Sequence, residues 1–368
     1  MSIKHRISKA VGFRPRRGRG GYALRLIAAV ALAAGAFSAT PANAQVDANA
    51  LAPAVHTVAC GGGVSVRMVT PNAGFDPQTA SDAQLDANAL PPRPTNAAAL
   101  AVWKRFIAMP DDPTPRCPVN SATSPARSAP LAPISTRPSK AVSAASEVNS
   151  THWSGNIADD QSYTDAFGTW DVPFSGPRPA SDPAYSSSWV GVGQGDSAEQ
   201  PLMQAGTESD NTGEASYYLW WELYPENDQK FIGYVEPGDS IYVHAHLSYG
   251  DDYAIAEDLT SGLGKGQNFY LSETSIWPDN TAEWIFERTE LVGSTSIYPM
   301  LADAPPTFTG ATALGTGYGG TVLGDLPHYY SDMFTCNGDT EMASPGSINS
   351  AGGFTLHWLS YGTQEPAC

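Results

Sequence analysis

Two polar side chains stand out because each lies within a short, largely apolar run. Glu283 lies in TAEWI at residues 281–285, and Gln204 lies in LMQAG at residues 202–206. A glutamate carboxylate can take a proton from water and later return it to a leaving group. A glutamine amide can donate a hydrogen bond to an oxygen on which negative charge develops. The pair suits hydrolysis of an acyl bond, although an exposed strand acid and a turn hydrogen bond are the simpler explanations of the two residues taken alone.

The other familiar catalytic and metal-binding patterns are missing from the sequence. It contains no HExxH, no Walker A and no GxSxG motif. Residues 315–320 match GxGxxG by letter, but the βαβ context is absent, so we predict a glycine loop there. His244 and His246 share one face of an expected strand, but no third ligand is evident. We therefore expect an exposed histidine pair, no metal and no cofactor.

The elements that must position Glu283 and Gln204 are β-strands. From Trp153 onward, apolar and polar residues alternate in short runs separated by turn signals, and no segment has a convincing helical pattern. We expect strands near residues 163–173, 186–193, 200–206, 215–224, 240–249, 252–259, 267–272, 281–288, 294–300 and 353–361. This pattern predicts an all-β fold, an antiparallel sandwich of the jelly-roll or concanavalin type.

One expected strand has two aromatic faces. Successive strand side chains point to opposite sides, so in residues 217–224 one face carries Tyr217 and Trp221 and should join the core. The other face carries Tyr218, Trp220 and Glu222. Such a face suits a substrate groove, although a solvated face with incidental aromatic residues is the alternative.

Charge divides the chain into three parts. The whole chain has a net charge of −17. Residues 1–44 contain eight basic and no acidic residues, residues 45–150 are almost neutral, and residues 151–368 contain four basic and 30 acidic residues. An acidic surface repels phosphate backbones, which makes nucleic acid an improbable partner. The composition, with 42% hydrophobic residues, also excludes a mostly disordered chain and a multi-span membrane protein.

The first part has the features of an export signal. A basic stretch precedes an apolar run, and Ala42-Asn43-Ala44 fits a cleavage site before Gln45. Arg16-Arg17 fits a twin-arginine signal or simply a long basic region. Either way we predict a signal peptide at 1–44 and a secreted protein, extracellular or periplasmic, with no membrane contact after signal removal.

The second part has the features of a propeptide. We predict a propeptide region at 45–117, with a helix near 96–108, and a Pro/Ser/Ala-rich linker at 118–149 before a domain at 150–368. An independent accessory domain is the alternative. The four cysteines allow three pairings, of which one bridge in each part, Cys60–Cys117 and Cys336–Cys368, is the simplest.

Seven segments in order resemble the glutamic peptidase, or eqolisin, family. They are HWSG (152–155), GTWDVP (168–173), SWVG (188–191), LMQAG (202–206), WWELYP (220–225), PGDSI (237–241) and TAEWI (281–285). The resemblance implies the β-sandwich fold and a secreted acid endopeptidase made as a zymogen. It also implies that Glu283 is the catalytic base and acid and that Gln204 stabilises the oxyanion. An ordinary glutamate titrates near pH 4.3, so it can act as a base at about pH 3–5.

The resemblance also predicts which residues bind substrate. It shows two positions at which this sequence differs from the family. Trp189, Trp220 and Glu222 are expected to line the groove. Glu208 and Tyr218 stand where the family has aspartates, which bears on the pH profile and the preference for substrate. We expect protein or peptide substrates, inhibition by the chain's own propeptide, and a monomer.

Two other functions fit the same fold. Glu222 and Glu283 could form the carboxylate pair of a glycosidase. Alternatively, the tryptophans could stack on sugars in a carbohydrate-binding protein without catalysis. Gln204 would be dispensable in the glycosidase, and full function of a Glu283→Gln variant would favour the binding protein.

Overall fold

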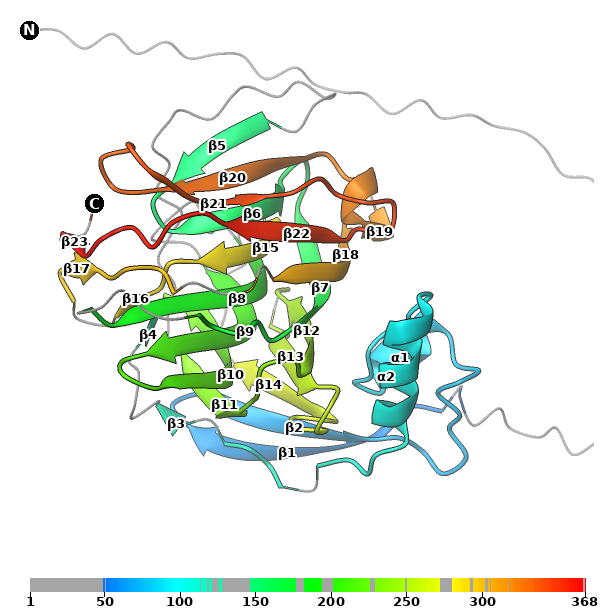
Figure 1. Cartoon of the computed structure of the whole chain (residues 1–368). Helices are drawn as coiled ribbons and strands as arrows, with labels where there is room; N and C mark the ends of the chain where they lie inside the picture. Colours follow the sequence, from blue (N-terminus) through cyan, green and yellow to red (C-terminus); the bar gives the residue numbers. More distant parts are fainter. Residues whose placement is uncertain are drawn as a thin grey trace, which may run out of the picture. The chain divides into compact units, whose positions relative to one another are not determined.

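The described residues from Asn49 onward fold as two β-sheets that pack face to face (Figure 1). Val46–Cys368 form one compact unit. The computed structural model describes residues 49, 51–112, 114–117, 119–120, 126–127, 146–176, 182–193, 201–225, 229–248, 250–271, 280–291, 294–301, 304, 306–316, 318–366 and 368. The expected signal peptide at 1–44 lies outside these residues.

The front sheet carries both candidate catalytic residues. Its central strands pair in the order β11–β10–β9–β8–β15–β6–β20, all antiparallel. They are β11 (Lys230–Tyr234), β10 (Ala215–Tyr224), β9 (Leu202–Asn211), β8 (Ala184–Gly193), β15 (Thr281–Glu287), β6 (Trp153–Ala158) and β20 (His328–Phe334). Beyond β20 lie β5 (Ser146–Ser150), which pairs with it in parallel, and β21 (Glu341–Pro345) and β22 (Phe354–Trp358).

The back sheet is also antiparallel. Its strands pair in the order β18–β7–β12–β13–β14–β2–β1. They are β18 (Thr307–Gly315), β7 (Tyr163–Asp171), β12 (Ser240–His246), β13 (Asp252–Asp258), β14 (Gln267–Leu271), β2 (Val64–Thr70) and β1 (Ala54–Gly61), and β19 (Tyr318–Val322) pairs with β18. The predicted all-β antiparallel sandwich is therefore confirmed. The predicted glycine loop joins β18 to β19.

The core lies between the two sheets and is rich in tryptophan. Trp221 of the front sheet stacks on Phe269 of the back sheet, with ring centroids 6.2 Å apart. Each remaining indole that crosses the core needs a hydrogen-bond acceptor. Trp170 donates to Thr207 Oγ1 at 3.0 Å, and Trp284 Nε1 lies 2.7 Å from the carbonyl oxygen of Phe167. The face of residues 217–224 predicted to join the core does so.

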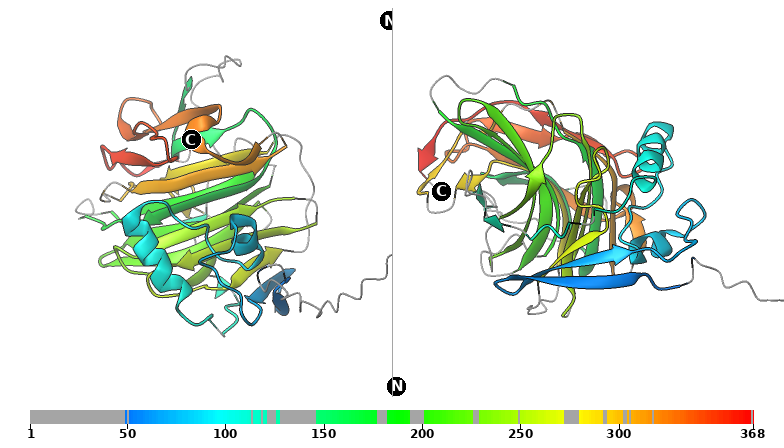
Figure 2. Two further views of the ribbon diagram at one scale, coloured as in Figure 1. Left: turned by 90° about the vertical axis from the view of Figure 1, so that its right-hand side faces the viewer. Right: turned by 90° about the horizontal axis from the view of Figure 1, so that it is seen from below.

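The N-terminal segment packs on the outer face of the back sheet. It contains α1 (Asp82–Ala87), which begins at a Ser81 capping box, and α2 (Ala97–Ile107), which Asn96 caps; the latter is the helix predicted near 96–108. Figure 2 shows both helices lying across the back-sheet strands. Leu85, Trp103 and Phe106 form a second apolar cluster with Tyr242 and Ile255 of that sheet.

Lys265 joins the N-terminal segment to the sandwich at the end of α2. Its ammonium group donates to the carbonyl oxygens of Phe106 and Ile107, in the last turn of the helix, and of Met109 just after it. A cation at this end of a helix is favourable because the last carbonyls lack intrahelical partners. The segment is therefore attached by polar as well as apolar contacts.

Three short strands lie within the predicted linker or at its end. β3 (Val119–Asn120) pairs with β11 at one edge of the front sheet, and β5 pairs with β20 towards the other edge. Between them, β4 (Ala126–Arg127) pairs with β16 (Glu290–Leu291), which follows β15. The chain from 120 to 146 thus joins points on opposite sides of the front sheet. The predicted boundaries at 117 and 149 remain predictions.

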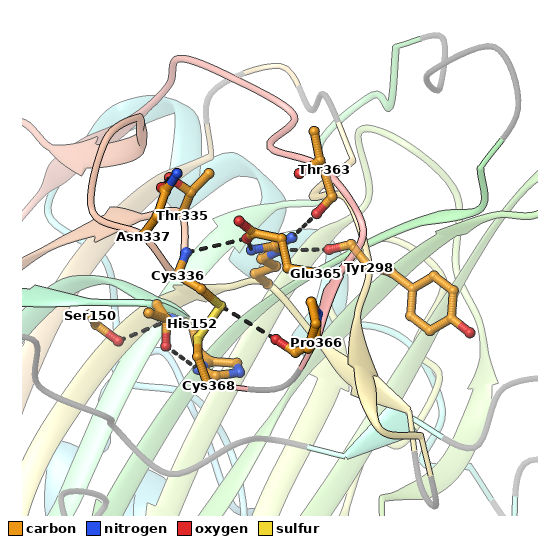
Figure 3. The surroundings of a disulfide bond; sticks show 12 residues. Ser150, His152, Tyr298, Thr335, Cys336, Asn337, Thr363, Glu365, Pro366 and Cys368 are labelled. Carbon is orange, nitrogen blue, oxygen red and sulfur yellow. Dashed lines mark hydrogen bonds and ion pairs between the residues drawn. A yellow bond between two sulfur atoms is a disulfide. The ribbon is translucent and has the colours of Figure 1, made fainter.

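The two disulfides connect the cysteines in the simplest of the three pairings, Cys60–Cys117 and Cys336–Cys368. The second bridge holds the C-terminal tail beside the end of β15 (Figure 3). There the buried Arg288 pairs with Glu365 at 2.9 Å, and the amide of Cys336 donates to the same carboxylate. β23 (Glu365–Pro366) pairs with β17 (Ser296–Ile297), so the strand predicted at 294–300 is only two residues long.

Gly206 offers a test of the front-sheet packing. A Cβ added there would lie 2.3 Å from the carbonyl oxygen of Ser188 and 2.6 Å from Trp189 Cβ. We expect Gly206→Ala to lower the free energy of unfolding by roughly 2–4 kcal/mol through overpacking. Urea denaturation would measure this. Gly319→Ala, where a Cβ meets nothing within 4 Å, is the control and should have little effect.

Candidate active site

Glu283 and Gln204 lie on one line that crosses four neighbouring strands. The register pairs Glu283 of β15 with Gly191 of β8, Gly191 with Gln204 of β9, and Gln204 with Glu222 of β10. Residues paired directly across a sheet share one of its faces. All four therefore lie on the front-sheet face that points away from the core.

Gly191 separates the two functional side chains without adding one of its own. Glu283 and Gln204 are two strand spacings apart, roughly 10 Å between backbones. A Cβ on Gly191 would lie 3.2 Å from Gln204 Cβ and 3.0 Å from the Trp189 ring. Because Gly191 has no side chain, nothing projects from the sheet between Glu283 and Gln204. Both side chains can therefore contact the same small group placed over Gly191.

Glu222 orients the amide of Gln204. Gln204 Nε2 donates to Glu222 Oε2 at 2.9 Å, and both side chains are buried. This bond fixes which end of the amide is the nitrogen and leaves its second N–H for another acceptor. Among the described residues, nothing donates to Gln204 Oε1.

Thr281 lies next to the Glu283 carboxyl group. Its Oγ1 is 2.5 Å from Glu283 Oε1 and 2.6 Å from the carbonyl oxygen of Gly193. One hydroxyl has a single proton to donate but can also accept. It can donate to an ionised Glu283, or it can accept from a protonated Glu283 while donating to Gly193. The site therefore accommodates both protonation states of Glu283.

The predicted groove residues surround this line, but they are not exposed. Trp189 and Trp220 flank Gly206 in the next row of the same face, and Trp189 donates to Glu287 at 2.7 Å. All seven predicted site residues (Glu283, Gln204, Trp189, Trp220, Glu222, Glu208 and Tyr218) are at most 1% exposed. The face predicted to form the groove is therefore buried, and its role in substrate binding stays a prediction. Cavities of about 420 and 480 Å³ lie elsewhere, beside His328 and beside Arg116.

Glu208 and Tyr218 belong to a separate polar group on the same face. Tyr218 donates to Gln229 Oε1 at 3.1 Å, and Gln229 donates in turn to Glu208 at 3.4 Å. Thr289 donates to the other oxygen of Glu208 at 2.8 Å. Burial, together with the nearby carboxylates of Asp210 and Glu287, raises the pKa of Glu208 well above its ordinary value.

Sequence reasoning missed Thr281, Gln229 and Thr289. Residue type and spacing gave no signal for Gln229 and Thr289, because their roles depend on which segments are neighbours in the fold. Thr281 lies two positions before Glu283 on the same strand face, and that periodicity alone could have suggested a contact.

The histidine pair is not exposed as predicted. His244 is completely buried, and Asp165 of β7 lies opposite His246 in the register of the back sheet. Asp165 Oδ1 is 2.8 Å from His244 Nε2 and 2.7 Å from His246 Nδ1. The third side chain that the sequence did not reveal is thus supplied by a strand about 80 residues away.

Comparisons with known proteins bear on the front-sheet site. Residues 151–328 match the model of the Peptidase A4 family. This part of the chain therefore resembles the peptidase A4 family. The matched range includes both Glu283 and Gln204, so the resemblance to the glutamic peptidases is confirmed, and with it the expectation of a peptidase.

Two curated relatives and one solved structure extend the comparison. Aspergillopepsin-2 of Aspergillus niger is 27% identical over 191 residues, which cover 46% of this chain and 67% of the relative. Scytalidopepsin B of Scytalidium lignicola is 28% identical over 166 residues, covering 45% of this chain and 62% of the relative. A crystal structure of scytalido-glutamic peptidase with a transition state analog inhibitor aligns with 57% of this chain and 98% of its own, at 22% identity and a TM-score of 0.47.

The raised pKa of Glu208 predicts how the stability of the fold depends on pH. The folded chain holds a proton on Glu208 at pH values where the unfolded chain has lost it, so stability should fall as pH rises above about 4.5. We expect Glu208→Gln to raise Tm at pH 7 and to leave it nearly unchanged at pH 4. Calorimetry in a Glu283→Gln background would measure this without self-digestion.

The exposed Glu341 is the control for this prediction. Glu341→Gln should leave Tm nearly unchanged at both pH values. A Glu208→Gln variant less stable than its parent at pH 7 would contradict the assignment of a protonated carboxyl group.

Proposed function

We propose that this chain is a secreted acid endopeptidase that hydrolyses peptide bonds with Glu283 and Gln204. The observation that carries the proposal is the line Glu283–Gly191–Gln204–Glu222 across the front sheet. It brings a carboxyl group and an oriented amide to either side of a residue without a side chain. The peptidase A4 match over the same residues supports the reaction class.

In this mechanism Glu283 first acts as a general base. Its carboxylate takes a proton from a water molecule, whose oxygen attacks the carbonyl carbon of the scissile peptide. Negative charge develops on the carbonyl oxygen, and Gln204 Nε2 donates to it the hydrogen that Glu222 does not use. Glu222 is thus a positioning residue, because it holds the amide in the donating orientation.

Glu283 then acts as a general acid. It gives its proton to the peptide nitrogen, the carbon–nitrogen bond breaks, and the carboxylate is restored. Thr281 Oγ1 can form a hydrogen bond with Glu283 in both protonation states. It accepts from the protonated carboxyl group and donates to the carboxylate once Glu283 has given its proton to the peptide nitrogen. Only one ionisable group is needed, which supports activity in acid, where an ordinary glutamate is still partly ionised.

The buried state of the site supports synthesis as a zymogen. All the site residues are covered in the full chain, so substrate can reach Glu283 only after a covering segment moves or is removed. The region from 120 to 146 is the candidate for cleavage, since its ends pair on opposite sides of the front sheet. Two disulfides support export, and among the described residues no helix is long and apolar enough to cross a membrane.

The glycosidase alternative is less well supported. Glu222 and Glu283 are three strand spacings apart, roughly 14 Å between backbones, whereas paired glycosidase carboxyl groups lie about 5–9.5 Å apart. In addition, the Glu222 carboxylate is already bonded to Gln204. The carbohydrate-binding alternative requires exposed tryptophans, and Trp189 and Trp220 are buried.

Activity assays on three variants test the proposal. At about pH 3.5, with an unfolded protein as substrate, we expect Gln204→Ala to lower kcat roughly 100- to 1000-fold through loss of an oxyanion donor. Glu283→Gln should lower it by at least about 1000-fold. Glu222→Gln should lower kcat by less than either, because its amide oxygen can still accept from Gln204.

The matched controls are Glu341→Gln and Gln364→Ala, which change exposed residues of the same types. Both should retain the activity of the parent. Intact mass after acidification should show loss of roughly the first hundred residues in the parent and in both controls, but not in Glu283→Gln or Gln204→Ala. An active Glu283→Gln variant, or a parent that leaves both itself and the substrate uncut, would sink the proposal.

A further inference from the structure

The cluster of Asp165, His244 and His246 lies on the back sheet, separate from the front-sheet site. The two histidines are two positions apart on β12, and Asp165 is on the neighbouring β7. Their nearest nitrogen and oxygen atoms all lie within 4.8 Å of one another. Two imidazole nitrogens and a carboxylate oxygen form a donor set typical of zinc sites with three protein ligands.

Both imidazole rings are held in place by stacking. Phe167 stacks on His244 with ring centroids 4.1 Å apart, and Tyr253 stacks on His246 at 4.7 Å. The rings therefore aim fixed nitrogens at one carboxylate oxygen, Asp165 Oδ1. Rigid, convergent ligands reduce the cost of ordering a metal site.

The other nitrogen of each ring faces a polar partner. His244 Nδ1 is 3.2 Å from Asp86 Oδ1, and His246 Nε2 is 2.8 Å from Ser248 Oγ. A carboxylate behind a ligating histidine fixes its tautomer and strengthens it as a metal ligand. If the proton of the neutral His244 ring is on Nδ1, facing Asp86, then Nε2 and Asp165 Oδ1 are two acceptors 2.8 Å apart, and a second proton or a cation must lie between them.

We propose that Asp165, His244 and His246 bind one zinc ion, with Asp86 and Ser248 as the outer partners of the two histidines. In a tetrahedral zinc site with bonds of about 2.0–2.1 Å, ligand atoms are about 3.3 Å apart. Asp165 Oδ1 needs to move only about 0.5 Å away from each nitrogen to reach that spacing. The fourth position is left for water.

The zinc ion would connect the N-terminal segment to the sandwich. Asp86 belongs to α1, whereas the three ligands belong to the back sheet that α1 and α2 cover. Losing this segment would remove the outer partner of His244. Loss of such a partner typically lowers metal affinity 10- to 100-fold.

Zinc titration of the full chain tests the proposal. The protein is freed of metal with a chelator at pH 7.5, and ZnCl₂ is added in a calorimeter. We expect one zinc per chain with a dissociation constant in the micromolar range or below. Cobalt substituted at the site should give the intense visible absorption of a four-coordinate ion.

Three variants locate the site. His246→Gln should weaken zinc binding at least 100-fold, and Asp86→Asn, which alters a half-exposed side chain, should weaken it about 10-fold or more. His56→Gln, which changes an exposed histidine on β1, is the control and should bind as the parent does. If His246→Gln does not fold, Asp86→Asn alone decides the test.

Two results would overturn the proposal. One is a parent chain that binds no zinc with 1:1 stoichiometry. The other is binding that His246→Gln and Asp86→Asn leave unchanged. Either result would mean that the cluster binds no metal. The histidines and their carboxylates would then be held together only by hydrogen bonds and ion pairs.

Discussion

The pairing register of β15, β8, β9 and β10 is the constraint on which the front-sheet site depends. Strand side chains alternate between faces, so a slip of one residue would turn Glu283 or Gln204 into the core. The register is fixed because the opposite face of each strand is largely apolar: Trp284, Val190, Ala205 and Trp221 all lie in the core. The tryptophan-rich core thus determines the chemistry on the other side of the sheet.

The two faces of the molecule have separate tasks in the proposed zymogen. The helices α1 and α2 and the β1–β2 hairpin pack on and beside the back sheet, on the far side of the core from Glu283. They do not cover the front-sheet site themselves. What they provide is an anchor from which the chain proceeds, through β3 and β4, to the front sheet. An inhibitory segment attached in this way needs little affinity of its own, since its effective concentration is high.

Much of this architecture could be predicted from the sequence, and particular residues show why. The period-two pattern identified β10 with its correct bounds at 215–224 and assigned Tyr217 and Trp221 to the core. Glu283 and Gln204 were identified through motifs that resemble a family, and the structure places them on one line. The strands β18 and β20 were missed because their apolar residues do not alternate strictly with polar ones.

The errors concern burial and contacts distant in sequence. The exposed histidine pair was wrong because the covering helix α1 and the partner Asp165 come from distant parts of the chain. The burial of the predicted groove face could not be read from the sequence for a related reason: exposure depends on what else the chain places over a face, which composition does not encode. Local pattern determines the direction of a side chain, whereas burial depends on the whole topology.

The β1–β2 hairpin has a further consequence for a processed enzyme. β2 pairs with β14 over five residues, Gln267–Leu271, and so completes the hydrogen bonding of that strand. Cys60 and Cys117 both lie in the N-terminal segment, so no disulfide ties this segment to the sandwich. Once released, the segment would leave β14 as a bare sheet edge, and unpaired edges invite association with other strands. In the proposed zymogen, the residues that maturation would discard would therefore also protect this sheet edge from aggregation.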